Sequence, residues 1–385
     1  MKQGSAVASM KDLFIKTISG VLLLFFLISI LVSFNISSTT VQQAVTNISG
    51  EELFYLFSFE NSYSEQALPE TFKEPSLLNW AFTVATNIDT SDLRTLLGRE
   101  LPGLAAFDGR IIVAGEGANF ANLPFESSPP LQVLLEEREA ASNEMEDNGD
   151  YVNYVYDNQN EITSIGEEEV NILIHHTHSW ESFLPHLNVP NDNPNLASHN
   201  EVNITLVGER LGEELEKRGF NVVVDTRDMV AELHQRDMEV HQSYDLSREY
   251  VKEYLDETEF DFIFDLHRDA ARRENSTVEI NGRELARPFF VIGESHDNFE
   301  RNQMHATKLH YMMEESFPGL SRGVFGYERT SGRNGIYNQD ISEFSFLLEI
   351  GGVDNTLEES FKTAEIVAEI FANYYLELRK SEQLN

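Results

Sequence analysis

The part of the chain after Val170 alternates short apolar runs with amphipathic stretches, and this alternation limits the fold more than any other feature. The apolar runs predict strands at residues 171–175, 220–225, 260–266, 288–293 and 344–350. Helices are predicted between and after them, at residues 204–215, at 298–316 and from Thr356, where T-x-x-E forms a capping box. This order predicts an α/β fold, an open mixed sheet flanked by helices, with any site at the carboxyl ends of the strands.

The composition excludes several classes of protein. The chain has 65 acidic against 28 basic side chains and a net charge of -37, so it lacks the basic stripe that a nucleic-acid binder needs. It contains no cysteine, which excludes disulfides, cysteine-ligated zinc, iron–sulfur clusters and thiol catalysis. Any metal must therefore be held by His, Asp and Glu.

An uncharged apolar stretch near the N-terminus predicts a membrane anchor. Residues 17–34 are 18 residues without a charge, long enough to cross the apolar core of a bilayer. Lys2, Lys11 and Lys16 precede this stretch with a single Asp12, so the positive-inside rule places the N-terminus in the cytoplasm and the rest of the chain outside. A cleaved signal peptide is the alternative, but no A-x-A pattern follows the apolar core closely.

The composition along the chain predicts five parts. Residues 136–169 contain twelve acidic side chains and only one basic one, which is typical of a solvated linker. The parts are a cytoplasmic tip and transmembrane anchor (1–35), a stalk (36–80), a small membrane-proximal region (81–135), the acidic linker (136–169) and a catalytic domain (170–385).

Chemically functional residues gather where the predicted strands end. His178 and Glu181 have the spacing H-x-x-E after the first strand, and His267 follows the third. Two imidazoles and a carboxylate are a ligand set of catalytic zinc, which keeps its fourth position for water. Glu349 is the only charge in the apolar run 344–350, so it is the candidate general base.

Each of these residues also has a purely structural interpretation. Asp265 or Asp269 can satisfy His267 with an ordinary hydrogen bond. Glu349 can form an ion pair with Arg268, Arg272 or Arg329. His176 remains a further candidate, either as a metal ligand or as a donor of a hydrogen bond to one of the ligands. We expect the other histidines on polar or helical stretches to lie at the surface, namely His186, His199, His234, His241, His296, His305 and His310. The polar segment 331–340 is expected to form a loop near the site that binds substrate.

Several motifs resemble the stage II sporulation protein P family of endospore-forming bacteria. They are HHTHSWESF at 175–183, SYDLSR at 243–248, FDLHRDA at 264–270, PGLSRGV at 318–324, NGIYNQD at 334–340 and LLEIGGVDNTLEE at 347–359. The likeness extends from about residue 90 to about 376 and includes GRELPGL at 98–104 and LPFESSPP at 123–130.

The resemblance implies an exported, membrane-anchored peptidoglycan hydrolase that acts during engulfment of the forespore. Its implied place is the mother-cell membrane, facing the forespore septum. The family is similar to the zinc N-acetylmuramoyl-L-alanine amidases and has both amidase and cross-link endopeptidase activities. Its implied partners are stage II sporulation proteins D and M. The alternatives are a zinc carboxypeptidase acting on wall peptides and a wall-binding scaffold without catalysis.

Carried over by position, the resemblance makes His178 and His267 zinc ligands and Glu349 the catalytic glutamate. The third ligand stays open, because Glu181 has the H-x-x-E spacing whereas the amidases more often use a glutamate at the start of the next helix, where this chain has Glu201. Arg268 is a candidate catalytic residue at the oxyanion. The candidate substrate-binding residues are Arg248, Asn334, Tyr337 and Asn338.

The predicted topology can be tested on intact protoplasts. Because positive charges before residues 17–34 orient the anchor, external protease is expected to remove the domain after residue 40 and to leave a membrane-embedded stub. Immunoblotting with antibodies against each end measures both products. Protection of the C-terminal domain would show that the orientation is wrong.

Overall fold

The computed structural model describes residues 109–119, 123–124, 129–135, 140, 162–166, 168–191, 193–330 and 333–382. These residues all belong to one compact unit that spans residues 106–385. The predicted anchor, the stalk and most of the acidic linker lie outside the described residues. Within the described part of the chain, no helix is both long and apolar enough to span a bilayer.

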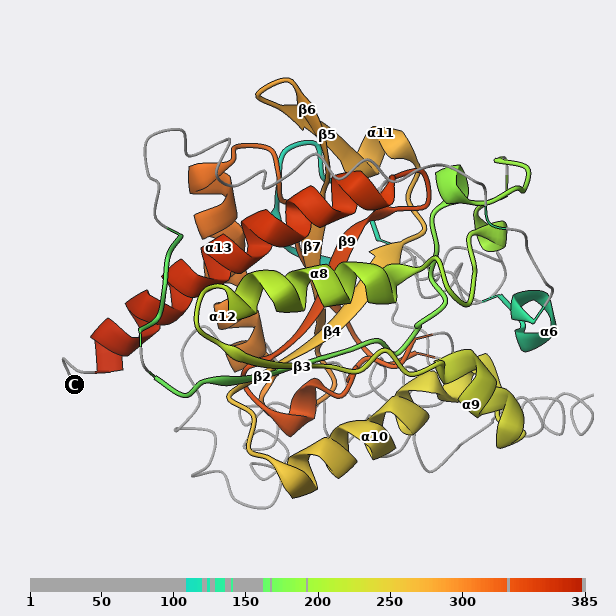
Figure 1. Ribbon diagram of the computed structural model, residues 1–385, viewed down its shortest axis with the longest axis horizontal. Helices are drawn as coiled ribbons and strands as arrows, with labels where there is room; N and C mark the ends of the chain where they lie inside the picture. The colour runs from blue at the N-terminus through green and yellow to red at the C-terminus, as the bar shows by residue number, and fades with distance from the viewer. Residues whose placement is uncertain are drawn as a thin grey trace, which may run out of the picture. The chain divides into compact units, whose positions relative to one another are not determined.

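A seven-stranded mixed sheet forms the centre of the unit (Figure 1). Its order is β1-β8-β7-β9-β4-β2-β3. The strands are β1 (Arg110–Ala114), β2 (Asn171–His175), β3 (Asn221–Val224), β4 (Phe262–Asp269), β7 (Pro288–Gly293), β8 (Gly323–Tyr327) and β9 (Ser345–Gly352). The pairs β3·β2, β2·β4 and β4·β9 are parallel, as is the pair β7·β8. The pairs β9·β7 and β8·β1 are antiparallel. The predicted α/β class with an open mixed sheet is therefore confirmed.

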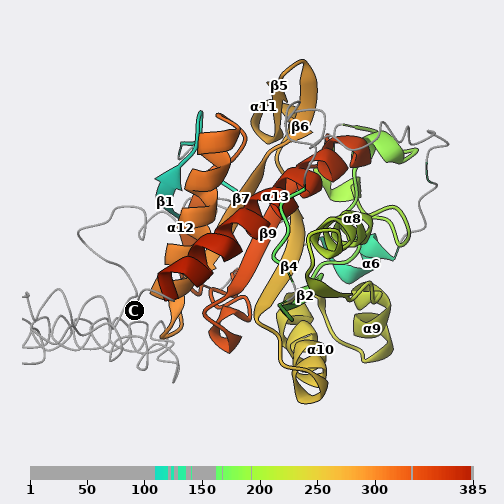
Figure 2. The same cartoon turned by 60° about the vertical axis from the view of Figure 1, so that its left-hand side comes forward.

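Helices cover both faces of this sheet (Figures 1 and 2). One face packs against α8 (Ile204–Glu216), α12 (Phe299–Ser316) and α13 (Leu357–Glu382). There Phe264 stacks on Phe346, with ring centroids 5.2 Å apart, and meets Phe371 of α13 edge-on at 5.1 Å. The opposite face packs against α10 (Ser243–Glu257), whose Val251 contacts the strands in an apolar cluster, and α9 (Met229–Gln235) packs beside α10.

The remaining elements are short. They are α6 (Leu131–Leu134), η4 (Leu184–His186), η5 (Pro194–Leu196), η6 (Val240–Gln242), α11 (Arg273–Ser276), η7 (Gln339–Ile341) and the hairpin of β5 (Thr277–Ile280) and β6 (Arg283–Ala286).

The structure agrees with most of the predicted elements of the catalytic domain. Each predicted strand and helix is present within three residues of its expected bounds, and the largest difference is at the end of β4. The capping box is also confirmed, since Glu359 N donates to Thr356 Oγ1 (3.2 Å) and Thr356 N donates to Glu359 Oε2 (3.1 Å).

The division of the chain differs from the prediction in one respect. Residues 81–135 were expected to form a separate membrane-proximal region, but β1 pairs with β8 at the edge of the main sheet and α6 packs against α9 through Leu131, Leu134 and Val230. A strand completes its hydrogen bonds wherever an unpaired edge is available, so distance along the sequence does not keep β1 out of this sheet.

A buried ion-pair network joins α8 to α13. Arg218 is fully buried; its Nη1 lies 2.9 Å from Glu214 Oε2 and its Nε lies 3.1 Å from Glu369 Oε2. Glu214 is fully buried as well. Burial by itself would raise the pKa of Glu214, but Lys217 and Arg218 outweigh it and hold the pKa below its usual range. The packing of the two helices therefore depends on the arginine.

Arg218→Met is expected to destabilise the protein strongly, because it leaves Glu369 buried without its cation and leaves buried Glu214 with only Lys217 and Arg210 as cations. Breaking a buried pair from one side costs about 3–5 kcal/mol, which urea unfolding followed by circular dichroism would measure. Lys252→Met is the matched control, since Lys252 is exposed on α10. Equal midpoints for the two variants would contradict this account.

Candidate active site

The carboxyl ends of β2, β4 and β9 bring the predicted site residues to one edge of the sheet. In the parallel register His175 is paired with Asp265, and His267 is paired with Glu349. Paired positions on neighbouring strands point to the same face. His267 and Glu349 therefore lie side by side on the face opposite Phe264 and Phe346.

The loop that follows β2 places His178 and Glu181 against His267. The rings of His178 and His267 meet edge-on with centroids 5.3 Å apart, and Glu181 Oε2 lies 3.6 Å from His267 Nδ1. Glu181 is buried and also accepts from Arg268 N (2.7 Å). Glu201, by contrast, is exposed in the segment before α8.

Asp265 fixes His267 from the side opposite Glu181. Its Oδ1 lies 2.9 Å from His267 Nε2 and 3.6 Å from His175 Nδ1. The same carboxylate accepts from Thr177 N (2.9 Å) and Thr177 Oγ1 (2.6 Å). His267 is thus held between two buried carboxylates, and its Nδ1 is the nitrogen that faces Glu181.

The electrostatics favour positive charge between these carboxylates. Burial alone would lower the pKa of His267, but Asp265 and Glu181 raise it well above its ordinary value. Burial would raise the pKa of Asp265, yet His175, His267 and Thr177 hold it well below its usual range. Burial lowers the pKa of His175, and it lowers that of His176 to about 4.

The donor set fits zinc in chemistry and in proximity, although its donor atoms are not converged. Two imidazoles that share a tetrahedral zinc at the usual bond length have ring centroids about 5 Å apart, close to the 5.3 Å between His178 and His267. Among the described residues, however, no three His, Asp or Glu side chains are gathered as closely as an ion requires. Holding zinc would therefore require His178, Glu181 and His267 to reorient so that their donor atoms converge.

Glu349 is buried at 6% exposure and is the only charged residue of β9. The chain turns sharply just after it. Gly351 has φ +74, and a Cβ on Gly352 would lie 2.3 Å from Ala271 O, so only glycine fits both positions without rearrangement. The two glycines form the end of β9, where the backbone passes too close to Ala271 for a side chain.

The three arginines considered as partners of Glu349 make other contacts. Arg268 donates through Nη2 to Ala197 O (2.9 Å) and through Nη1 to Asp269 O (3.1 Å). Arg272 pairs with Asp354 at 2.9 Å, and Arg329 donates to Asn334 O at 3.0 Å. The guanidinium of Arg268 is therefore rigidly held, and its buried Nε has no hydrogen-bond partner among the described residues.

The predicted substrate-binding loop packs against α10. Arg248 pairs with Asp340 at 2.6 Å, and Asn338 Nδ2 donates to Tyr244 O (3.1 Å) and Ser247 Oγ (3.0 Å). Tyr337 and Asn338 have φ +53 and +56, which is strained for residues other than glycine. Asn334 Oδ1 accepts from the backbone of 336 and 337. Their roles in binding substrate stay predictions.

Tyr244 is the aromatic residue that the sequence interpretation overlooked. Its ring stacks on His267 with centroids 6.3 Å apart and meets His178 and Tyr337 edge-on, at 5.6 and 5.2 Å. The only signal in the sequence was its place in SYDLSR, a motif that periodicity does not distinguish.

Several histidines expected at the surface are buried, and for these the prediction was wrong. They are His186, His199, His305 and His310. His186 Nε2 accepts from Leu357 N (2.9 Å) at the start of α13, and His199 Nδ1 accepts from the backbone at 201 and 202, both at 3.0 Å. A buried imidazole can accept hydrogen bonds from backbone N–H groups at the start of a helix or in a turn. The polar residues around a histidine in the sequence do not indicate this role. His176 packs against Gly208 of α8, away from His267.

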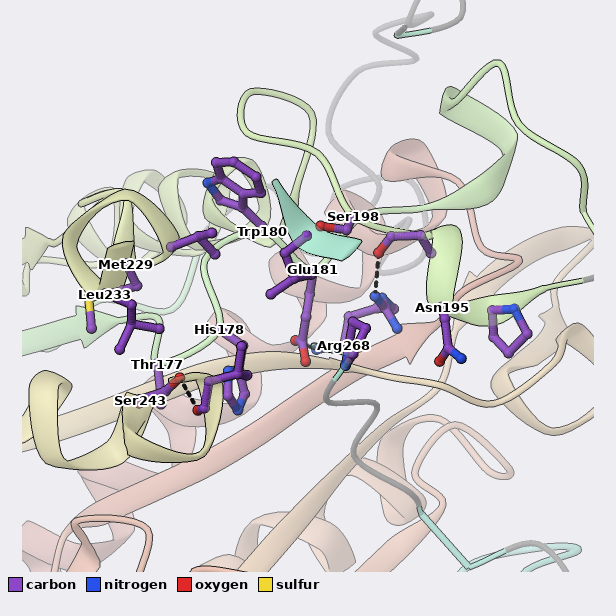
Figure 3. A pocket seen from close by; sticks show the side chains of 16 residues that line it. Thr177, His178, Trp180, Glu181, Asn195, Ser198, Met229, Leu233, Ser243 and Arg268 are labelled. Atoms are coloured by element: carbon purple, nitrogen blue, oxygen red, sulfur yellow. Dashed lines mark hydrogen bonds between the residues drawn. The ribbon is translucent and has the colours of Figure 1, made fainter. Parts of the chain in front are cut away.

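A pocket opens beside His178, Glu181 and Arg268 (Figure 3). Its walls come from α6, α9, η6, the loop after β2 and the segment 194–198. Met229 and Leu233 lie at the left of the view and Asn195 at the right, with Glu181, Ser198 and Arg268 between them (Figure 3).

Comparison with known proteins gives one family and one curated relative. The family model described as stage II sporulation protein P matches residues 91–372. Stage II sporulation protein P of Bacillus subtilis (strain 168) is 38% identical over 345 residues, which cover 89% of this chain and 85% of the relative.

Solved structures are similar only weakly. The amidase CwlD of Clostridioides difficile, solved in complex with the lipoprotein GerS, is 13% identical with a TM-score of 0.35, covering 56% of this chain and 100% of that one. An N-acetylmuramoyl-L-alanine amidase from Clostridium difficile 630 is 14% identical with a TM-score of 0.31, covering 55% and 98%. These values are too low to carry an argument about function.

Proposed function

The chain belongs to the stage II sporulation protein P family, and from this premise we propose that it is a membrane-anchored zinc peptidoglycan hydrolase. Its substrate would be the amide between N-acetylmuramic acid and L-alanine, with stem-peptide cross-links as a second target. The observation that carries the proposal is the meeting of His178, Glu181 and His267 at the strand ends, with Glu349 in register beside His267.

His178, Glu181 and His267 would hold the metal in this proposal. When bound in such a set, zinc polarises a carbonyl and lowers the pKa of water. Asp265 supports the assignment because its contact with His267 Nε2 leaves Nδ1 for the ion, a common arrangement for metal-ligating histidines. Glu181 is favoured over Glu201 because only Glu181 is buried against His267.

Two further side chains would carry out the proton and charge transfers. Glu349 accepts a proton from the attacking water and later returns it to the leaving nitrogen, which is the task of a single buried carboxylate near the reacting carbon. Arg268 stabilises the negative oxygen of the tetrahedral intermediate through its Nε, which has no hydrogen-bond partner among the described residues. Its two terminal nitrogens only fix the guanidinium.

Membership of the family also suggests a cellular location and protein partners. We propose that it works during forespore engulfment, in the mother-cell membrane, with stage II sporulation proteins D and M as partners. A net charge of -37 disfavours general adhesion to an anionic cell wall. Recruitment by a partner therefore fits this chain better than direct binding to the wall.

The zinc assignment is tested by metal content. Full-length protein is expected to bind one zinc, and Glu181→Gln is expected to lose it, because a neutral amide is a poor replacement for an anionic ligand. Glu201→Gln is the matched control and should keep its zinc. Metal analysis by mass spectrometry measures both. Loss from Glu201→Gln with retention in Glu181→Gln would move the third ligand to Glu201.

Glu349→Gln separates the general base from the ligands. The variant preserves shape but cannot accept a proton, so zinc content should persist while release of peptide from purified wall falls roughly 10²–10⁴-fold. The new chain ends in the products identify the bond that wild-type protein cleaves, and a carboxypeptidase would give different ends. Undiminished hydrolysis by Glu349→Gln would remove this residue from the mechanism.

A further inference from the structure

The pocket beside the candidate site has an apolar side that the proposed chemistry does not use. We name it the Trp180 pocket after the indole that lines it. Its apolar lining includes Leu134, Trp180, Met229, Val230, Leu233 and Val240. It adjoins His178, Glu181 and Arg268, which line the same space, so a group held in the pocket lies next to the proposed reacting atoms.

Two polar side-chain atoms of residues that line this pocket have no hydrogen-bond partner among the described residues. They are Ser198 Oγ and Trp180 Nε1, and both atoms are buried. Ser198 as a whole is only 3% exposed. A buried polar group without a partner is unfavourable, so the pair indicates that a ligand supplies the missing group. A hydroxyl and an indole N–H can both donate, and the matching group is an acceptor such as a peptide carbonyl oxygen.

The backbone holds Ser198 in position before any ligand arrives. Ser182 N donates to Ala197 O (3.0 Å) and His199 N donates to Trp180 O (3.1 Å). These bonds fold the segment around Ser198 antiparallel against Glu181, with which Ser198 forms a β-bridge. The hydroxyl is therefore presented by a rigid backbone.

The size of the pocket limits what can enter. The free space is about 30 Å³, and since a water needs roughly 10–15 Å³ by this measure, it holds two or three waters. A muramoyl sugar, with its hydroxyls and acetamido group, is too large and too polar for such a space. A methyl or another short alkyl side chain fits.

We propose that the Trp180 pocket binds the first residue of the stem peptide, an L-alanyl residue, on the amine side of the cleaved bond. Its methyl group lies among Leu233, Val240 and Trp180, its carbonyl oxygen accepts from Ser198, and the indole N–H of Trp180 donates to a separate acceptor of the peptide. This inference rests on the proposed function, because it places the peptide part of that substrate. It makes Val240 and Ser198 determinants of specificity.

The test compares N-acetylmuramoyl-L-alanyl-D-isoglutamine with analogues that carry glycine or L-norvaline in place of L-alanine. Full-length zinc-loaded protein in detergent is used, and kcat and KM are measured for each compound. Val240→Ala enlarges the pocket and is expected to shift the preference toward norvaline by roughly tenfold or more, while Val240→Leu shifts it as far toward glycine. Val223→Ala is the matched control, since Val223 lies on β3 and is 37% exposed.

The polar half of the pocket is tested separately. Ser198→Ala is expected to raise KM roughly two- to tenfold and to leave kcat nearly unchanged, as for loss of a hydrogen bond made equally in the ground and transition states. Trp180→Phe retains most of the aromatic surface without the N–H and should behave in the same direction. A fall in kcat at constant KM would show that these residues do not hold the substrate.

Binding measurements separate this inference from the proposed reaction. Calorimetry with free L-alanyl-D-isoglutamine and its glycyl and norvalyl analogues reports the pocket without hydrolysis. Should the wild type hydrolyse nothing, an affinity ranking that Val240 controls would still support the pocket. An identical ranking of the three peptides in wild type, Val240→Ala and Val240→Leu would overturn it, whether or not the protein is an amidase.

Discussion

The buried carboxylate of Asp265 is the group on which the candidate site depends most. It accepts both the backbone N–H and the hydroxyl of Thr177, and it lies 2.9 Å from His267 Nε2. The loop after β2 and the end of β4 are therefore held by one side chain. Thr177 Oγ1 lies 2.9 Å from Ser247 Oγ, which in turn accepts from Asn338. A single network thus ties four segments of the chain to the position of one imidazole.

The sheet makes this network possible by separating its two faces. Phe262, Phe264 and Leu266 point from β4 into the core beneath α8 and α13. The alternate residues Asp265, His267 and Asp269 point to the other face. All residues of β4 are buried, so each polar side chain on it must find a partner, and those partners define the site. Because the whole strand is buried, the partners of its polar residues show where the candidate site lies.

The site and the Trp180 pocket divide the proposed substrate between them. Two carboxylates around His267 create a place for positive charge at the reacting centre, and the arginine held by Ala197 O and Asp269 O lies beside it. The pocket beyond Glu181 is apolar and small. Backbone hydrogen bonds position Ser198, and the strained turn at Tyr337 and Asn338 packs against Tyr244. Strain of this kind persists only where surrounding contacts enforce it.

The sequence by itself determined the α/β class, the strands that carry the site and the candidate residues at their ends. Period and strand-end chemistry are local properties, so His178, Glu181, His267 and Glu349 could be named before the structure was known. Local patterns also missed what depends on distant contacts. The pairing of β1 with β8, the burial of His186 and His199, and the place of Tyr244 between His178 and Tyr337 were decided only by the tertiary structure. An unpaired strand edge or a buried polar group must be hydrogen-bonded by residues that are close to it in space. Those residues can be distant in sequence, so a local sequence pattern does not identify them.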